Sequence, residues 1–121
     1  MEKATEYHSF AVSEISNGIF SITFSESSLS EDCVRKTSDE LIGFIQGNSG
    51  KKFVLNLERV QFCSSLGAGL FIRITGLDVP VVFCGLSGKV ATVLQLLRIY
   101  NLLPQSDSQA KAVTTLSRMA N

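Results

Sequence analysis

Short apolar runs rich in β-forming residues open the chain, and a helical pattern follows them. Residues 10–15 and 19–24 are two such runs on either side of Ser16-Asn17-Gly18, which is typical of a hairpin turn. Over residues 29–46 the apolar positions fall mostly on one face of a helix, and Ser28 with Glu31 is typical of a capping box at its start. We therefore expect an antiparallel hairpin followed by a first helix.

The middle of the chain predicts a strand, a helix and a second strand. Residues 53–57 form a strongly apolar run of the kind found in strands that are covered on both faces. Apolar residues then recur at helical spacing over residues 66–77, and residues 79–84 are another β-rich run. These three elements fit a βαβ unit, whose two strands are parallel.

The last third of the chain predicts two more helices. Ser87 is the expected N-cap of a helix that runs to about residue 99, with a buried stripe of Val90, Val93, Leu94 and Leu97. Residues 102–104 are expected to form a brief edge strand, where Pro104 is tolerated, and Asp107 or Ser108 to cap a terminal helix. The whole chain, 1–121, is thus expected to be one α/β domain with its core at about residues 8–118, a mixed sheet of four to five strands and about four helices.

Charge and cysteine content exclude several kinds of partner. The 11 Lys and Arg residues balance the 11 Asp and Glu residues, so the chain has no cationic excess for binding nucleic acid. Cys33, Cys63 and Cys84 are widely spaced and form no C-x-x-C pair, which argues against a disulfide framework or a zinc site. Cys63 and Cys84 end apolar runs and are expected to be small core residues. We expect neither a metal nor a cofactor.

The apolar segments are too short for a membrane. No apolar run precedes a small-residue cleavage site near the N-terminus, and no stretch approaches the roughly 18 apolar residues that a spanning helix needs. We therefore expect a cytoplasmic protein without membrane insertion.

The motifs of common enzymes fail on inspection. Gly67-Ala68-Gly69 lacks the third glycine of a dinucleotide loop, because Ile72 occupies that position. Gly88-Lys89 is followed by Val90 rather than by the Ser or Thr of a phosphate-binding loop. A Ser-His-Asp triad would depend on His8, the sole histidine, which is expected to lie on the surface. An enzyme with a serine nucleophile is the least favoured interpretation, and we expect no catalytic residues.

One segment remains, Cys63-Ser64-Ser65-Leu66-Gly67, between a predicted strand and a predicted helix. Its hydroxyls should lie at the carboxyl edge of the sheet, where ligands and partners bind in α/β folds. In one interpretation a serine merely caps the helix and the glycines permit close packing. In the other, the two glycines have a functional reason. Gly67 and Gly69 each cost roughly 1 kcal/mol in a helix, and their lack of side chains leaves a helix surface that a protein partner can approach.

The order of elements and the segment Val60-Gln61-Phe62-Cys63-Ser64-Ser65-Leu66-Gly67 resemble the STAS domain family, the fold of bacterial anti-sigma-factor antagonists. In that family an apolar-x-Asp-Ser-Ser-Gly-apolar motif begins the second helix, and its first serine is phosphorylated. Ser65 falls on the acceptor position, while Ser64 replaces the aspartate and Leu66 the second serine. The resemblance implies phosphorylation of Ser65, with Ser64 as the alternative acceptor.

The resemblance extends over about residues 10–116, with two further departures. Asn56 stands where the family's strand usually ends in aspartate, and Arg98 stands where a helix-ending glycine is common. The order of the matching elements, more than any one motif, indicates the family.

The resemblance also implies partners. The unphosphorylated form would bind an anti-sigma factor, a serine kinase of the histidine-kinase-like ATPase type, and a serine phosphatase would reset the switch. The expected binding residues are Ser27, Ser28, Ser64, Ser65, Leu66, Gly67 and Ala68. The alternative is an unphosphorylated STAS interaction subunit of a lipid-transport ATP-binding cassette complex, which Ser64 in place of aspartate favours.

Overall fold

The computed structural model describes residues 4–6 and 9–119, which fold around a six-stranded mixed sheet. The sheet has the order β1-β2-β3-β5-β7-β8, with β1 (Ala4–Glu6), β2 (Phe10–Ser16), β3 (Ile19–Phe24), β5 (Lys52–Asn56), β7 (Val81–Cys84) and β8 (Gln105–Ser106). A separate two-stranded sheet pairs β4 (Ser28–Leu29) with β6 (Phe62–Cys63). The helices are α1 (Glu31–Gln46), α2 (Ser65–Thr75), α3 (Gly88–Leu96) and α4 (Gln109–Ser117), with a 3₁₀ turn η1 (Tyr100–Leu102). The predicted α/β class, with a mixed sheet and four helices, is confirmed; the short β1 and β8 extend the sheet at its edges.

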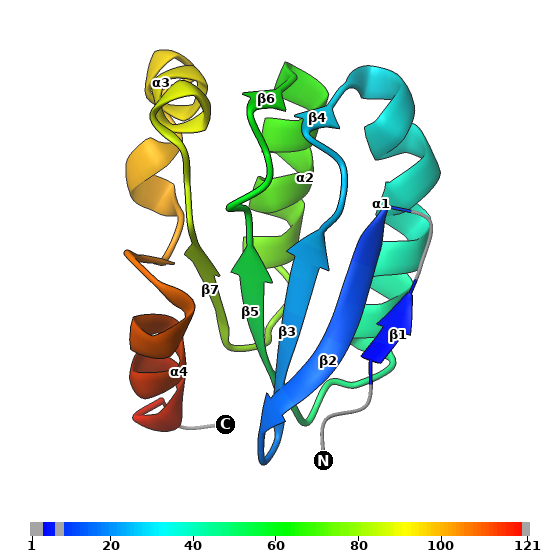
Figure 1. Cartoon of the computed structure of the whole chain (residues 1–121), viewed down its shortest axis with the longest axis vertical. Helices are drawn as coiled ribbons and strands as arrows, with labels where there is room; N and C mark the ends of the chain where they lie inside the picture. The colour runs from blue at the N-terminus through cyan, green and yellow to red at the C-terminus, as the bar shows by residue number, and fades with distance from the viewer. Residues whose placement is uncertain (1–3, 7–8, 120–121) are drawn as a thin grey trace.

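The hairpin and the βαβ unit occur where the sequence predicts them. β2 and β3 are antiparallel, and Gly18 between them has φ +78°, a backbone conformation that glycine adopts without steric cost. β5, α2 and β7 form the crossover, and β3, β5, β7 and β8 are all parallel neighbours. The carboxyl ends of the parallel strands therefore point to one end of the molecule, the upper end in Figure 1.

Alternation along the strands divides the core between the two faces of the sheet. Ile22 and Phe24 of β3, with Phe53 and Leu55 of β5, belong to the larger cluster, which α1, α2 and α3 complete. The intervening positions, such as Val54, belong to a smaller cluster that α4 completes. The strand period of two thus assigns each side chain to one face.

A serine N-cap precedes each of the four α-helices. Ser64, Ser87 and Ser108 cap α2, α3 and α4, each accepting a hydrogen bond from the backbone N–H three residues on. The predicted cap of α1 was wrong: Ser30 accepts from the Cys33 N–H at 3.3 Å, while Ser28 lies in β4. Pairing with β6 holds Ser28 in extended backbone, so the helix begins two residues later.

Two predicted boundaries near the C-terminus were also wrong. α3 ends at Leu96 because Arg98 adopts φ +62°, which lets the Ile99 N–H donate to the Leu94 carbonyl at 3.0 Å and close the helix. Leu97 is consequently exposed instead of completing the buried stripe. The edge strand begins at Gln105 and not at residue 102, because residues 100–102 form η1.

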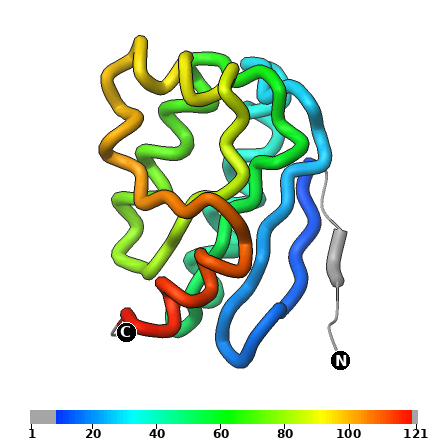
Figure 2. Tube along the Cα trace, turned by 60° about the vertical axis from the view of Figure 1, so that its left-hand side comes forward, coloured from blue at the N-terminus to red at the C-terminus, as the bar shows by residue number. Residues whose placement is uncertain are grey.

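Two segments that are distant in sequence meet at the upper end of the molecule. Figures 1 and 2 both place β4, β6, the first turn of α2 and α3 at this end, and α4 with the β2–β3 turn at the other. The strand ends that carry the predicted site are therefore grouped together.

Candidate partner-binding site

Ser64 is a structural residue at the start of α2. Its hydroxyl accepts a hydrogen bond from the Gly67 N–H at 3.1 Å and donates one to the Leu29 carbonyl at 2.9 Å. The Ser64 N–H donates to the same carbonyl at 3.0 Å. Ser64 is half-buried and joins α2 to β4, so its hydroxyl already has partners on both sides.

Ser65, the next residue, has the opposite character. It is the first residue of α2 and is exposed, and its hydroxyl forms no hydrogen bond with any described residue. The first turn of α2 contains no acidic side chain. The backbone N–H groups of this turn and the helix dipole make the position favourable for negative charge. Of the two serines, Ser65 is therefore the one available to an external reagent.

Ser27 and Ser28 lie next to this helix start. The Ser27 carbonyl accepts hydrogen bonds from the Gln61 and Phe62 N–H groups at 2.7 and 3.1 Å, and β4 pairs with β6 in parallel. Both serines are exposed. The structure thus brings Ser27 and Ser28 close to the Ser64-Ser65 pair, although about 35 residues separate them in the chain.

Phe62 belongs to the same surface and was not predicted. Its side chain is 52% exposed in β6, while the adjacent Cys63 points inward and is buried. Leu66, predicted as a partner-binding residue, is 38% exposed. Two large apolar side chains therefore flank Ser65. Neighbouring strand residues point to opposite faces, so an inward Cys63 implies an outward Phe62. A strand of only two residues is too short for this alternation to be recognised in the sequence.

Gly67 and Ala68, also predicted to contact a partner, are buried. A Cβ at Gly67 would lie 2.9 Å from the Cys63 Sγ and 3.4 Å from the Leu29 carbonyl oxygen, which leaves no room for a side chain. Neither residue presents its side-chain position to a partner; both are packed beneath the exposed residues of the site. The close-packing interpretation therefore accounts for Gly67, whereas Gly69 is exposed and a Cβ there would meet nothing within 4 Å.

The two buried thiols, Cys63 beside the site and Cys84 on the α4 face of the sheet, are not activated. Burial raises the pKa of Cys63 to about 11. Burial and, secondarily, the Glu58 carboxylate raise the pKa of Cys84 to about 11. Both thiols therefore remain protonated at neutral pH, as expected of small core residues.

Among residues 4–6 and 9–119 the structure shows no group of three or more His, Cys, Asp or Glu side chains that could hold a metal ion. Within the same ranges no helix is long and apolar enough to cross a membrane. His8 lies outside the described residues. What the site offers chemically is the exposed Ser65 hydroxyl at a helix N-terminus, with the exposed apolar side chains of Phe62 and Leu66 beside it in the chain.

Comparison with known proteins identifies the fold. No family model and no curated protein matches the chain. Among solved structures, an anti-sigma-factor antagonist (STAS) domain protein from Planctomyces limnophilus superposes with a TM-score of 0.73 at 21% identity, covering 88% of this chain and 96% of that one.

Two further structures superpose comparably. The anti-sigma factor antagonist SpoIIAA in its unphosphorylated form has a TM-score of 0.72 at 16% identity, covering 93% of this chain and 99% of that one. A variant of RsbS from Moorella thermoacetica has a TM-score of 0.71 at 20% identity, with coverages of 86% and 94%. The chain therefore has the STAS fold, as the resemblance implied.

Proposed function

We propose that this chain is a partner-switching interaction module of the anti-sigma-factor-antagonist type, in which phosphorylation of Ser65 controls binding. The observation that carries the proposal is the exposed, unbonded Ser65 hydroxyl at the first position of α2, flanked by exposed Phe62 and Leu66. The STAS fold shared with known antagonists supports it.

The modification needs a second protein. The Ser65 Oγ would attack the γ-phosphorus of ATP held by a kinase, the bond to ADP would break, and the hydroxyl proton would pass to a base on the kinase. This chain contributes the acceptor alone. By the family analogy the kinase is also the binding partner, an anti-sigma factor of the histidine-kinase-like ATPase type, and a serine phosphatase hydrolyses the phosphoserine.

The fold is suited to carry the product. A phosphoserine adds about −1.5 to −2 charges at neutral pH. At the first position of α2 this charge faces free backbone N–H groups and the positive end of the helix dipole. Ser64 adds no competing negative charge, since it caps the helix with a neutral hydroxyl. We therefore expect phosphorylation to leave the domain folded.

Phosphorylation of Ser65 should instead weaken the binding of a partner at this surface. A partner that covers Phe62 and Leu66 must also remove water from Ser65, which lies between them in the chain. A neutral hydroxyl loses little by this, but a buried and unpaired dianion costs several kcal/mol. Because each 1.4 kcal/mol is a factor of ten, one phosphate is sufficient to reverse binding.

The decisive experiment combines modification and binding. The protein is incubated with Mg-ATP and a candidate kinase of this class, and the modified residue is mapped by mass spectrometry. Binding is then measured by calorimetry for wild type, Ser65→Ala and Ser65→Glu. We expect modification at Ser65, near-normal binding by S65A, and at least 100-fold weaker binding by S65E.

Ser49→Glu is the matched control, because Ser49 is exposed in the turn after α1, at the other end of the fold from Phe62, Ser65 and Leu66, which we call the switch surface. It should bind as wild type does. Modification at Ser64 or at no residue, or tight binding by S65E, contradicts the proposal.

A second function is favoured by one observation, the neutral Ser64 at the position of the family's aspartate. In this alternative the chain is an unmodified STAS subunit of a lipid-transport ATP-binding cassette complex, and Phe62, Ser65 and Leu66 serve only for docking. Phe62→Ala would then weaken binding to the transporter ATPase, while no kinase would label Ser65.

A further inference from the structure

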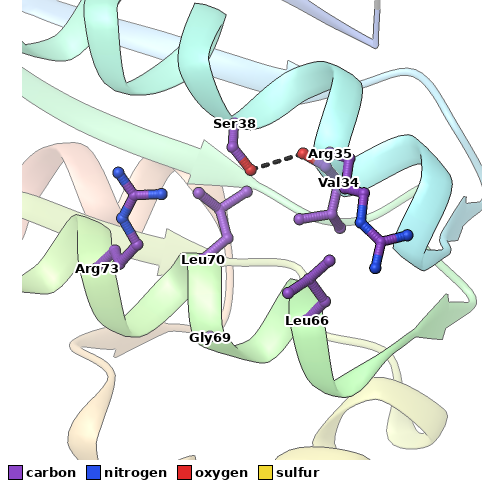
Figure 3. A pocket seen from close by; sticks show the side chains of 7 residues that line it. All are labelled: Val34, Arg35, Ser38, Leu66, Gly69, Leu70 and Arg73. Carbon is purple, nitrogen blue, oxygen red and sulfur yellow. Dashed lines mark hydrogen bonds between the residues drawn. The ribbon is translucent and has the colours of Figure 1, made fainter.

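A surface groove runs between α1 and α2, beside the candidate site. Its volume is about 390 Å³, and its apolar lining comes from Val34 of α1 and from Leu66 and Leu70 of α2. Figure 3 shows these three side chains between the two helices. Ser38 also lines the groove, but its hydroxyl donates to the Val34 carbonyl at 2.6 Å and so is already bonded to its own helix.

The α2 side of the groove is one helical stripe. Leu66, Gly69, Leu70 and Arg73 lie at positions i, i+3, i+4 and i+7, which span two turns, or about 10 Å, of one helix face. Gly69 is at the middle of the stripe, and a Cβ there would meet nothing within 4 Å. Packing within the chain therefore does not require this glycine, although glycine is unfavourable inside a helix. Its effect is to keep the middle of the groove open.

Two guanidinium groups stand at the margins of this apolar strip. Arg35 lies near Leu66 and Arg73 lies beyond Leu70, so they flank the leucines from opposite ends (Figure 3). Both arginines are exposed, and neither forms an ion pair with any carboxylate of the described residues. Glu31 and Asp39, one turn on either side of Arg35 along α1, leave it unpaired. The groove thus combines an apolar floor with two guanidinium groups that form no ion pair with any described carboxylate.

We propose that this groove binds an acidic amphipathic helix of a partner protein. Such a helix would place apolar side chains at i, i+3 or i+4 and i+7 over Leu66, Gly69 and Leu70, in the helix-in-groove mode. Carboxylates about two turns apart on its flanks would pair with Arg35 and Arg73, and arginine is suited to bidentate pairing with carboxylate.

Two alternatives fit these features less well. Small ligands are mostly enclosed by their pockets, whereas Arg35, Leu66, Gly69 and Arg73 are exposed and the groove is correspondingly shallow. A basic helix would meet two like charges. The unpaired guanidinium groups therefore select the acidic helix.

The groove adjoins the switch surface but does not depend on it. Leu66 lines the groove and directly follows Ser65, so a helix seated here would lie within one turn of the proposed phosphorylation site. The inference concerns the unmodified protein, and it stands whether or not Ser65 is ever phosphorylated.

The test uses a designed probe and its charge-swapped twin. The probe is a fluorescein-labelled 18-residue amphipathic peptide with leucines at helical spacing and glutamates along both flanks; the twin carries lysines in place of the glutamates. Fluorescence anisotropy should show that the acidic peptide binds on the order of tens of micromolar and that the basic twin binds at least tenfold more weakly. Backbone amide shifts in NMR spectra should change along α1 and α2.

Variants locate the binding. Arg35→Glu with Arg73→Glu should weaken binding of the acidic peptide at least tenfold, whereas Lys51→Glu with Arg118→Glu makes the same charge change at exposed positions outside the groove and should have little effect. Gly69→Phe should fill the groove and abolish binding. Gly43→Phe is its control, because Gly43 is an exposed glycine inside α1, outside the groove lining, with nothing within 4 Å of a Cβ.

Circular dichroism melts establish that each variant remains folded. Equal binding of the two peptides, unchanged binding by R35E/R73E, or unchanged binding by G69F overturns the proposal. Binding of the protein to phosphatidylglycerol vesicles without binding to the acidic peptide also overturns it, in favour of an anionic lipid surface.

Discussion

The two faces of the sheet use different packing. On the face covered by α1 and α2, aromatic rings contact one another through the core: Phe71 lies 6.4 Å from Phe24 and 5.3 Å from Phe83, measured between ring centroids. On the face covered by α4, the cluster of buried described residues contains no aromatic ring and consists of Cys84 and the aliphatic side chains of Ile19, Val54, Val82, Ala112 and Leu116.

Polar groups also reach the α4 face. The Gln109 side-chain oxygen accepts hydrogen bonds from the Ser21 hydroxyl at 2.8 Å and from the Asn56 amide at 3.3 Å. Asn56, at a position where the resemblance leads one to expect aspartate, thus contributes to the docking of α4. Each such hydrogen bond contributes only about 0.5–1.5 kcal/mol net, so we expect the larger, aromatic cluster to contribute more to stability than the α4 face.

This difference bears on function. α2 is anchored through Leu70, Phe71 and Ile74, all buried in the larger cluster, so its first turn is held on a rigid support. The exposed residues Phe62, Ser65 and Leu66 are therefore presented in a fixed arrangement. Binding sites benefit from such support because less conformational entropy is lost when a partner binds.

The largest expected difference between the two faces is the loss of unfolding free energy when one core residue on each is truncated to alanine. Phe71→Ala should lower the free energy of unfolding by about 3–5 kcal/mol, since it removes a fully buried ring and its ring contacts. Leu116→Ala, equally buried under α4, removes a smaller side chain from the smaller cluster and should cost less, toward the lower end of the about 2–5 kcal/mol typical of Leu→Ala. Urea unfolding of both variants measures this. A loss in L116A as large as that in F71A would contradict the expected difference between the two faces.

Substitution of alanine for each of the two glycines of α2 should change the stability of the protein in opposite directions. Gly67→Ala places a Cβ 2.9 Å from the Cys63 Sγ and should destabilise the protein by about 1–3 kcal/mol despite its better helix propensity. Gly69→Ala enters open space and should stabilise by up to about 1 kcal/mol. Thermal and urea unfolding report both values. Recovery of G67A by an added Cys63→Ala would identify the sulfur as the cause, and destabilisation by G69A would contradict the geometry.

The smallest expected difference between the two faces is the stability lost when the N-cap serine of a helix is replaced by alanine. Ser64→Ala should cost about 1–2 kcal/mol, because it removes the cap of α2 and the hydrogen bond to the Leu29 carbonyl. Ser108→Ala should cost about 1 kcal/mol or less, since this exposed hydroxyl only accepts from the Lys111 N–H at 3.2 Å. Ser65→Ala should change stability by less than about 0.5 kcal/mol. If S65A cost as much as S64A, the two serines would not have the separate roles assigned here.

Most of the architecture could be predicted from local pattern. The Ser16-Asn17-Gly18 turn, the apolar run over residues 53–57 and the helical spacing after Ser64 each depend on neighbouring residues, and all three elements occur in the structure. The predicted edge strand exists but begins at Gln105 and not at residue 102, because Tyr100–Leu102 form η1. Competition between a 3₁₀ turn and a short strand depends on what packs around them, which periodicity does not reveal.

The site was predicted less completely, for the same reason. The sequence singles out the Ser64-Ser65 pair, but it does not show which serine is structural and which is exposed. That difference follows from a contact across the fold, the hydrogen bond from Ser64 to the Leu29 carbonyl. The exposure of Phe62 and the burial of Gly67 likewise depend on how β4 and β6 pair. The groove beside Arg35 and Arg73 lies between α1 and α2, which β5 and β6 separate in the chain, so no local pattern indicates it.

By itself, then, the sequence determined the order of the longer strands and the helices, the α/β class and a serine pair at the start of a central helix, because turns, caps and amphipathic periods are properties of neighbouring residues; it did not indicate the short strands β1, β4 and β6. Tertiary structure alone decided that Ser64 is bonded while Ser65 is free, that Ser27, Ser28 and Phe62 surround them, and that two arginines flank an apolar groove. These properties arise from contacts between segments distant in the chain, and such contacts exist only once the sheet has brought the segments together.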